Sequence, residues 1–283
     1  MALERTDTMT ESIRVGDLPK ELTEGVVREL SAFSIGFARV VETANRPRVD
    51  LLGSGTLVTA GRKQAILTAH HVVQVLPRVG RLGLLLWSSD HPTTVDCAGL
   101  GFLEIARGVD DSVGPDLGAV VLSAPIASAI AAQKSFYNLD NRRDGVLNRP
   151  PQDNEGFWIA NGFIDERTTE HRGEGIVSKR FFNLSAAGGA ERQPDVDQFD
   201  YYQYPVSIEG REYSPRSFGG MSGGGLWQIP LAREGNGSVV SRTPLFSGLV
   251  FYQVPTTSSE CGVRCHGRRS IYEIAYEAIR GAL

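Results

Sequence analysis

Short runs of β-branched and apolar residues, cut by Gly, Pro, Asn and Asp, fill most of the chain from Ser34 onward. The first half contains "GTLVTA", "QAILTAHHVV" and "LGAVVLSA", and the second contains "FWIANGF", "GGLWQI" and "PLFSGLVFYQV". Runs of this kind at short intervals indicate an all-β barrel or sandwich. A polar, proline-bearing stretch at 141–156 lies between the two sets and predicts a linker. The sequence therefore predicts two β halves in series.

Both ends of the chain have helical spacing instead. Apolar residues recur at the helical interval in an N-terminal extension, at Leu22, Val26, Val27 and Leu30. The same interval recurs near the C-terminus, at Ile271, Ile274, Ala275 and Ile279. The predicted order is an extension at 1–33, a β half at 34–140, the linker at 141–156, a β half at 157–269 and a closing helix at 270–283.

The charge balance limits the partners that this chain can have. Its 283 residues include 29 basic and 33 acidic side chains, for a net charge of −4. So small a charge gives no global attraction to nucleic acid or to an anionic membrane, and neither is an expected partner. No stretch approaches the roughly 20 apolar residues of a membrane helix, and the first thirty residues lack the apolar segment of a signal peptide.

The cysteines bear on the compartment and on metal binding. Cys97, Cys261 and Cys265 are odd in number, which favours reduced thiols in a bacterial cytoplasm over a disulfide framework. The segment "ECGVRCHGRR" also places His266 beside two of these cysteines. Structural zinc usually takes four ligands, and no convincing fourth follows nearby. We therefore expect neither a metal nor a cofactor, and the role of Cys261, Cys265 and His266 stays open.

Three motifs carry residue types that suit acyl transfer. "LTAHHVV" contains His70 and His71, "VGPDLGAVVLSA" sets Asp116 before an apolar run, and "GGMSGG" surrounds Ser222 with glycines. A serine nucleophile needs a histidine base, and the base needs an acid that fixes its tautomer and stabilises the imidazolium. The oxyanion formed by the attack is best held by backbone N–H groups in a tight turn, which glycines permit.

These motifs resemble those of the trypsin-like, chymotrypsin-fold serine peptidases over roughly residues 34–253. "LTAHHV" is similar to the histidine motif of the family, "PDLGAVVL" to its aspartate strand and "GGMSGG" to its serine loop. "GSGTLVTA" and "FSGLVFYQ" resemble the strands before the histidine and after the serine. The resemblance implies two antiparallel six-stranded β-barrels with terminal helices. The catalytic residues would be His71, Asp116 and Ser222, with the choice between His70 and His71 still open.

The resemblance also implies the binding residues around Ser222. The amides of Gly220 and Ser222 would form the oxyanion hole, and a polypeptide would be the substrate. Met221 replaces the family's aspartate before the serine, so activation by a new amino terminus is not expected. The residues expected to bind substrate are Arg216, Phe251, Tyr252 and Gln253.

Two other readings stay beside the endopeptidase. One is a catalytically inactive, peptidase-like module that binds protein, with Arg216 blocking its pocket. The other is a nucleotide-binding module built on the glycine loop, although no GxxxxGK[ST] motif supports it. We also expect residues 1–33 to dock on the body or on a regulatory partner protein and to gate the cleft.

Overall fold

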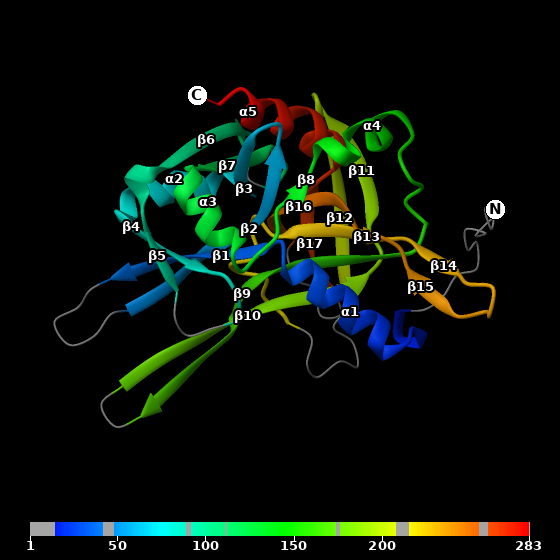
Figure 1. Ribbon diagram of the computed structural model, residues 1–283, viewed down its shortest axis with the longest axis horizontal. Helices are drawn as coiled ribbons and strands as arrows, with labels where there is room; N and C mark the ends of the chain where they lie inside the picture. Colours follow the sequence, from blue (N-terminus) through cyan, green and yellow to red (C-terminus); the bar gives the residue numbers. More distant parts are fainter. Residues whose placement is uncertain are drawn as a thin grey trace.

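The computed structural model describes residues 15–41, 48–88, 92–110, 112–173, 176–207, 215–254 and 260–282. The protein is mostly β, with two large sheets and one small hairpin sheet (Figure 1). The C-terminal helix lies along the upper edge of the molecule in this view, and the N-terminal helix lies along the lower edge. The sequence predicts an all-β fold with terminal helices, and the structure is mostly β with a helix near each end.

The first sheet belongs to the front half of the chain. Its strands follow the order β5-β4-β1-β2-β3-β7-β6, and β8 pairs in parallel with β2 outside this path. The eight strands are β1 (Ser34–Val41), β2 (Arg48–Ala60), β3 (Lys63–Thr68), β4 (Arg81–Leu85), β5 (Thr93–Asp96), β6 (Leu100–Arg107), β7 (Asp116–Leu122) and β8 (Tyr137–Asn138). The predicted six-stranded barrel differs from this sheet, because β5 and β6 end the path without pairing to each other in the described residues.

The second sheet belongs to the back half and follows the order β10-β9-β13-β16-β17-β12-β11. Its seven strands are β9 (Phe157–Gly173), β10 (Ile176–Gly188), β11 (Glu191–Val196), β12 (Phe199–Ser207), β13 (Gly225–Ile229), β16 (Leu245–Val254) and β17 (Glu260–His266). A separate hairpin pairs β14 (Leu231–Arg233) with β15 (Val239–Ser241). The strand number again differs from six. The long β9–β10 hairpin projects beyond the sheet at the lower left of Figure 1.

The helices are more numerous than the sequence predicts. They are η1 (Val15–Asp17), α1 (Lys20–Ser31), α2 (His70–Val75), η2 (Leu76–Val79), η3 (Cys97–Gly99), α3 (Ala124–Ala131), α4 (Asp140–Asn148), η4 (Ser270–Ala275) and α5 (Tyr276–Arg280). Helix α4 occupies the first half of the predicted linker at 141–156. Within the described ranges, no helix is both long enough and apolar enough to cross a bilayer.

An aromatic cluster joins the two sheets. Phe33 and Tyr137 come from the front half, and Trp227 and Phe246 come from strands of the second sheet. The ring of Trp227 lies 5.4 Å from that of Phe33 and 5.3 Å from that of Tyr137. Such offset and edge contacts add to the free energy gained by burying the rings. The cluster belongs to the main hydrophobic core, so both halves fold against each other rather than as separate units.

Helix α1 packs into the same core. Val26 and Leu30 are buried on its inner face, as the helical interval predicts. At its C-terminal end, the ammonium of Lys134 donates to the carbonyl of Ser31 at 2.6 Å and lies 3.7 Å from the centre of the Trp87 ring. The described part of the extension therefore docks on the body, and its action as a gate stays a prediction.

Lys134 predicts a pH dependence of stability. Burial lowers the pKa of its ammonium to about 7. The unfolded chain holds this proton up to about pH 10.4, so it binds more protons than the folded chain above pH 7 and stability rises with pH in this window. We expect Lys134→Met to remove this rise in urea unfolding measured from pH 7 to pH 9.5. Lys20→Met, at an exposed site on α1, is the control. Equal slopes for wild type and Lys134→Met would contradict the prediction.

Candidate active site

His71 lies at the start of α2, directly after the buried strand β3. Its ring Nδ1 and Asp116 Oδ2 are 2.5 Å apart, and its main-chain N–H donates to Asp116 Oδ1 at 3.0 Å. The ring contact orients the imidazole, and the main-chain contact ties the start of α2 to the same carboxylate. In the neutral form of the ring, the ionised carboxylate favours the tautomer with its proton on Nδ1, which keeps the lone pair on Nε2. The side chain is 47% exposed, so the ring is not enclosed by the protein.

Asp116 opens the fully buried strand β7 and is itself buried. Burial alone would raise the pKa of this carboxyl, but the hydrogen bonds and charge of His71 outweigh burial and hold the pKa below its usual value. The group is therefore ionised at neutral pH and places a negative charge against the imidazole. Its main-chain N–H donates to Nε2 of His266 at 3.1 Å.

The neighbouring histidine has a different partner. His70 Nε2 lies 2.9 Å from Glu104 Oε2, and the ring of His70 is 4% exposed. Both histidines lie on helix α2. Successive helical residues point about 100° apart. Of the two, His71 is the one that contacts Asp116, and the geometry favours it as the base.

Ser222 lies in a turn of the back half that is bound to a strand of the front half. Its carbonyl accepts the N–H of Ser54 on β2 at 2.8 Å. The following Gly223 has φ +92°, and a Cβ there would lie 2.0 Å from the Ser54 carbonyl oxygen. Only glycine fits so close an approach in this conformation. Gly223 is therefore needed to dock the serine turn on β2.

The serine turn and the histidine helix meet on either side of Gly53. A Cβ at Gly53 would lie 2.7 Å from Cγ2 of Val72, on α2, and 3.2 Å from the carbonyl oxygen of Ser222. The hydroxyl of Ser222 donates to the carbonyl of Phe251 at 3.4 Å. Among the described residues the Ser222 hydroxyl makes this hydrogen bond and none with His71. Catalytic hydrogen bonds are often loose or misaligned without substrate.

Two amides beside Ser222 are available to an incoming acceptor. The N–H groups of Gly220 and Ser222 donate to no acceptor within the part of the chain that the structure describes, whereas that of Met221 donates to Phe218 O at 2.9 Å. Gly220 has φ +90°, and a Cβ there would lie 2.3 Å from Cδ2 of Leu51. Unpaired amides in a rigid turn suit an oxyanion.

The predicted substrate-binding residues have mixed environments. Arg216 is exposed, and its main-chain N–H donates to Glu166 Oε2 at 2.8 Å. The side chain of Gln253 accepts from Phe218 N at 2.9 Å and donates to Arg216 O, so it holds the segment before Ser222. Tyr252 is partly buried.

Phe251 is placed differently from the other three, because its ring is buried and packs on Tyr201 and His266. Its side chain therefore does not line an open pocket. Glu166 on β9 accepts the main-chain N–H groups of Arg216 and Ser217, and an acid on a long strand gives no signal of this contact in the sequence.

The cysteine segment forms part of β17. Cys261 Sγ lies 3.6 Å from the carbonyl oxygens of Val206 and Pro215, and Cys265 is fully buried. Burial raises the pKa of both thiols. Among the described residues, no three His, Cys, Asp or Glu side chains are placed to hold a metal.

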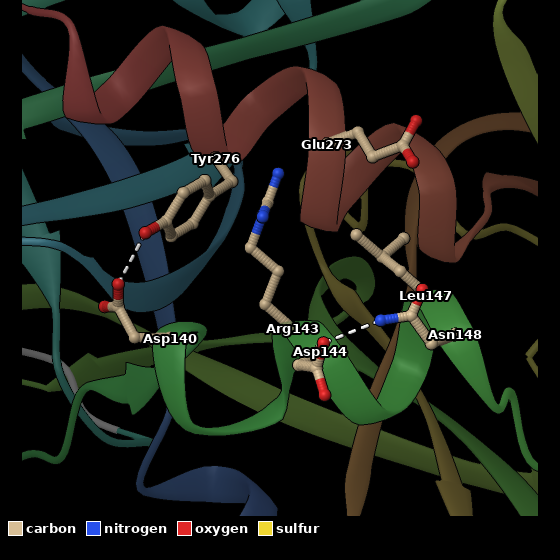
Figure 2. A pocket seen from close by; sticks show the side chains of 7 residues that line it. All are labelled: Asp140, Arg143, Asp144, Leu147, Asn148, Glu273 and Tyr276. Atoms are coloured by element: carbon tan, nitrogen blue, oxygen red, sulfur yellow. Dashed lines mark hydrogen bonds between the residues drawn. The ribbon is translucent and has the colours of Figure 1, made fainter.

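A cavity of about 420 Å³ lies elsewhere, between α4 and the C-terminal helix (Figure 2). Its lining residues are Asp140, Arg143, Asp144, Leu147, Asn148, Glu273 and Tyr276. Tyr276 Oη donates to Asp140 Oδ1 at 2.5 Å, and Asn148 Nδ2 donates to Asp144 Oδ1 at 2.6 Å. These polar groups bind one another, and none of the lining residues belongs to the candidate site.

Comparisons with known proteins give only distant likenesses. No family model and no curated protein matches the sequence. One similar solved structure is described under the coupled folding and binding of the intrinsically disordered Sesbania mosaic virus VPg protein. It has a TM-score of 0.42 at 11% identity, and the match covers 93% of each chain.

A second similar structure is the tobacco vein mottling virus protease. Its TM-score is 0.39 at 9% identity, and the match covers 91% of this chain and 82% of the protease. At these scores neither structure fixes the family or the activity of this protein.

Proposed function

We propose that this protein is a serine endopeptidase, with Ser222 as nucleophile, His71 as general base and Asp116 as the acid that orients it. The observation that carries the proposal is the 2.5 Å contact between His71 Nδ1 and Asp116 Oδ2, next to a serine turn bound to β2. The resemblance in five motifs, in the same order, supports it. We extend the proposal to a chymotrypsin-like architecture, with the site between the two β halves.

In the proposed mechanism the hydroxyl of Ser222 turns from Phe251 O toward Nε2 of His71 and attacks a peptide carbonyl. His71 takes the hydroxyl proton and passes it to the leaving amine, which yields an acyl-enzyme and the free amine. Water then releases the acyl group by the same two steps. The ionised Asp116 stabilises the imidazolium, and the amides of Gly220 and Ser222 receive the oxyanion.

Fluorophosphonate labelling tests this function. We expect the wild type to be labelled at Ser222 and Ser222→Ala to be unlabelled, because the probe reacts with a hydroxyl activated by a base. Ser217→Ala is the matched control, since Ser217 lies in the same glycine-rich segment and its Oγ accepts from Gly219 N. Labelling that persists in Ser222→Ala and disappears in Ser217→Ala would reject the assignment.

One observation favours the alternative of an inactive binding module. The hydroxyl of Ser222 is directed to Phe251 O instead of to His71. A module of this kind would bind peptides through the same surface without labelling or hydrolysis. A wild type that binds peptides but gives no labelling from pH 6 to pH 9 would support this alternative over the peptidase.

A further inference from the structure

His266 is a buried group that the proposed mechanism does not use. It ends β17, is fully buried, and accepts the main-chain N–H of Asp116 through Nε2 at 3.1 Å. A nitrogen that accepts is unprotonated, so the ring is neutral with its proton on Nδ1. Burial lowers the pKa of His266 to about 4, which keeps the ring neutral at physiological pH. The acceptor is therefore always available to Asp116.

Three aromatic rings pack around the imidazole of His266. The ring centres of Phe199, Tyr201 and Phe251 lie 5.7, 5.2 and 4.8 Å from it. Phe251 is also the residue whose carbonyl accepts the hydroxyl of Ser222. The same ring cluster therefore packs against His266, which contacts Asp116, and includes Phe251 of β16, which contacts Ser222.

A second contact of β17 reaches the loop before Asp116. The guanidinium of Arg264 donates to Ser112 O at 3.2 Å and stacks 4.9 Å from the centre of the Tyr201 ring. Gly114 has φ +84°, and a Cβ there would lie 3.1 Å from Tyr201 Oη. The loop that precedes Asp116 therefore packs on the second sheet through Ser112 and Gly114. The contact of His266 with the Asp116 N–H follows these two along the chain.

We propose that His266 is a positioning residue, which accepts the main-chain N–H of Asp116 and so fixes the carboxylate beneath His71. The role of this contact in catalysis rests on the proposed peptidase function, whereas its effect on the His71–Asp116 pair does not. The charged groups facing the ring are Asp116 on β7, Asp200 on β12 and Arg264 on β17. Without an acceptor, the Asp116 N–H would be buried and unpaired, and the start of β7 would shift to find one.

Substitutions at position 266 separate the acceptor from the bulk of the side chain. His266→Phe keeps a ring without an acceptor, and His266→Asn is too short to reach. His266→Gln places an amide oxygen near the former Nε2. Phe199→Leu is the matched control, because it loosens the ring cluster without removing the acceptor.

Two measurements read the effect. One is the rate of fluorophosphonate labelling, and the other is the NMR resonance of the His71 Nδ1 proton in ¹⁵N-histidine-labelled protein. We expect labelling to slow about 10- to 100-fold in His266→Phe and His266→Asn, because small displacements of catalytic groups have effects of this size. In both variants the resonance of the His71 Nδ1 proton should shift, and this proton should exchange faster with water. His266→Gln and Phe199→Leu should stay within a few-fold of wild type.

The outcomes distinguish this inference from the proposed function. A folded His266→Phe or His266→Asn with the wild-type Nδ1 resonance would overturn the positioning role. If His266→Phe does not fold, the contrast between His266→Asn and His266→Gln decides, and equal behaviour of those two would also overturn it. If the wild type is not labelled but the Nδ1 resonance of the wild type is lost in His266→Asn, the peptidase function is refuted and the positioning role of His266 is retained.

Discussion

His71→Ala is expected to lower kcat about a millionfold, with KM changed far less. In the proposed mechanism the imidazole removes the hydroxyl proton of Ser222 and returns it to the leaving amine, and loss of one member disables a catalytic unit of this kind almost completely. Nδ1 of His71 contacts Asp116, so Nε2 is the nitrogen left to accept the proton of the Ser222 hydroxyl. The measurement is hydrolysis of one fluorogenic peptide, chosen from a mixture with the wild type, followed by labelling of the same variants.

His70→Gln is the matched control for this loss. His70 lies next to His71 in the sequence but pairs with Glu104, so we expect its replacement to leave kcat within a few-fold. Asp116→Asn should fall between the two, at about 10⁴-fold, since an amide holds the wrong tautomer of His71. If His70→Gln abolishes activity while His71→Ala retains it, the base has been assigned to the wrong residue.

Local patterns predict the strands and the terminal helices well. "GTLVTA" lies in β2, "LGAVVL" lies in β7 and "PLFSGLVFYQV" contains β16, because β-branched runs fit a pleated, half-buried surface. The apolar spacing of α1 and of the C-terminal helix also matches their buried faces. These features depend on neighbours in the sequence, which is why the sequence carries them.

Helices α2 and α4 lack such signals. Helix α2 reads "HHVVQV", whose valines favour a strand as strongly as a helix, and it is only six residues long. Helix α4 reads "DNRRDGVLN", with one buried residue, Val146, and no apolar face. Both helices are held by tertiary packing rather than by intrinsic propensity. The sheet order and strand number likewise depend on pairings between distant segments, which alternation alone does not specify.

The site follows the same division. The motifs indicate Asp116, Ser222 and the histidine pair, because each lies in a short pattern with its own chemistry. His266 contacts Asp116 across 150 residues and Glu166 contacts Arg216 across 50, in both cases through the main chain of the partner. A contact to a main-chain group leaves no requirement on the side chain there. The sequence therefore indicates the groups that we propose to react and gives no signal for the residues that hold them.

Gly223→Ala is expected to destabilise the protein by about 2–5 kcal/mol, as the sum of a left-handed backbone penalty and overpacking. At φ +92° the new Cβ would lie 2.0 Å from Ser54 O and 2.3 Å from Thr68 Oγ1. It would enter the hydrogen bond in which Thr68 Oγ1 donates to Ser54 O at 2.7 Å. Urea unfolding monitored by tryptophan fluorescence measures the loss of stability.

Activity should fall in the same variant even where it remains folded. The hydrogen bond from Ser54 N to Ser222 O holds the serine turn on β2. The added methyl group at position 223 would push this turn away from α2 and His71. Gly219→Ala is the matched control, because its Cβ would meet Ser217 Oγ at an ordinary 3.4 Å. We expect that control to stay within about 0.5 kcal/mol of wild type. If Gly223→Ala is as stable and as readily labelled as Gly219→Ala, the docking of the serine turn on β2 is not what places the nucleophile.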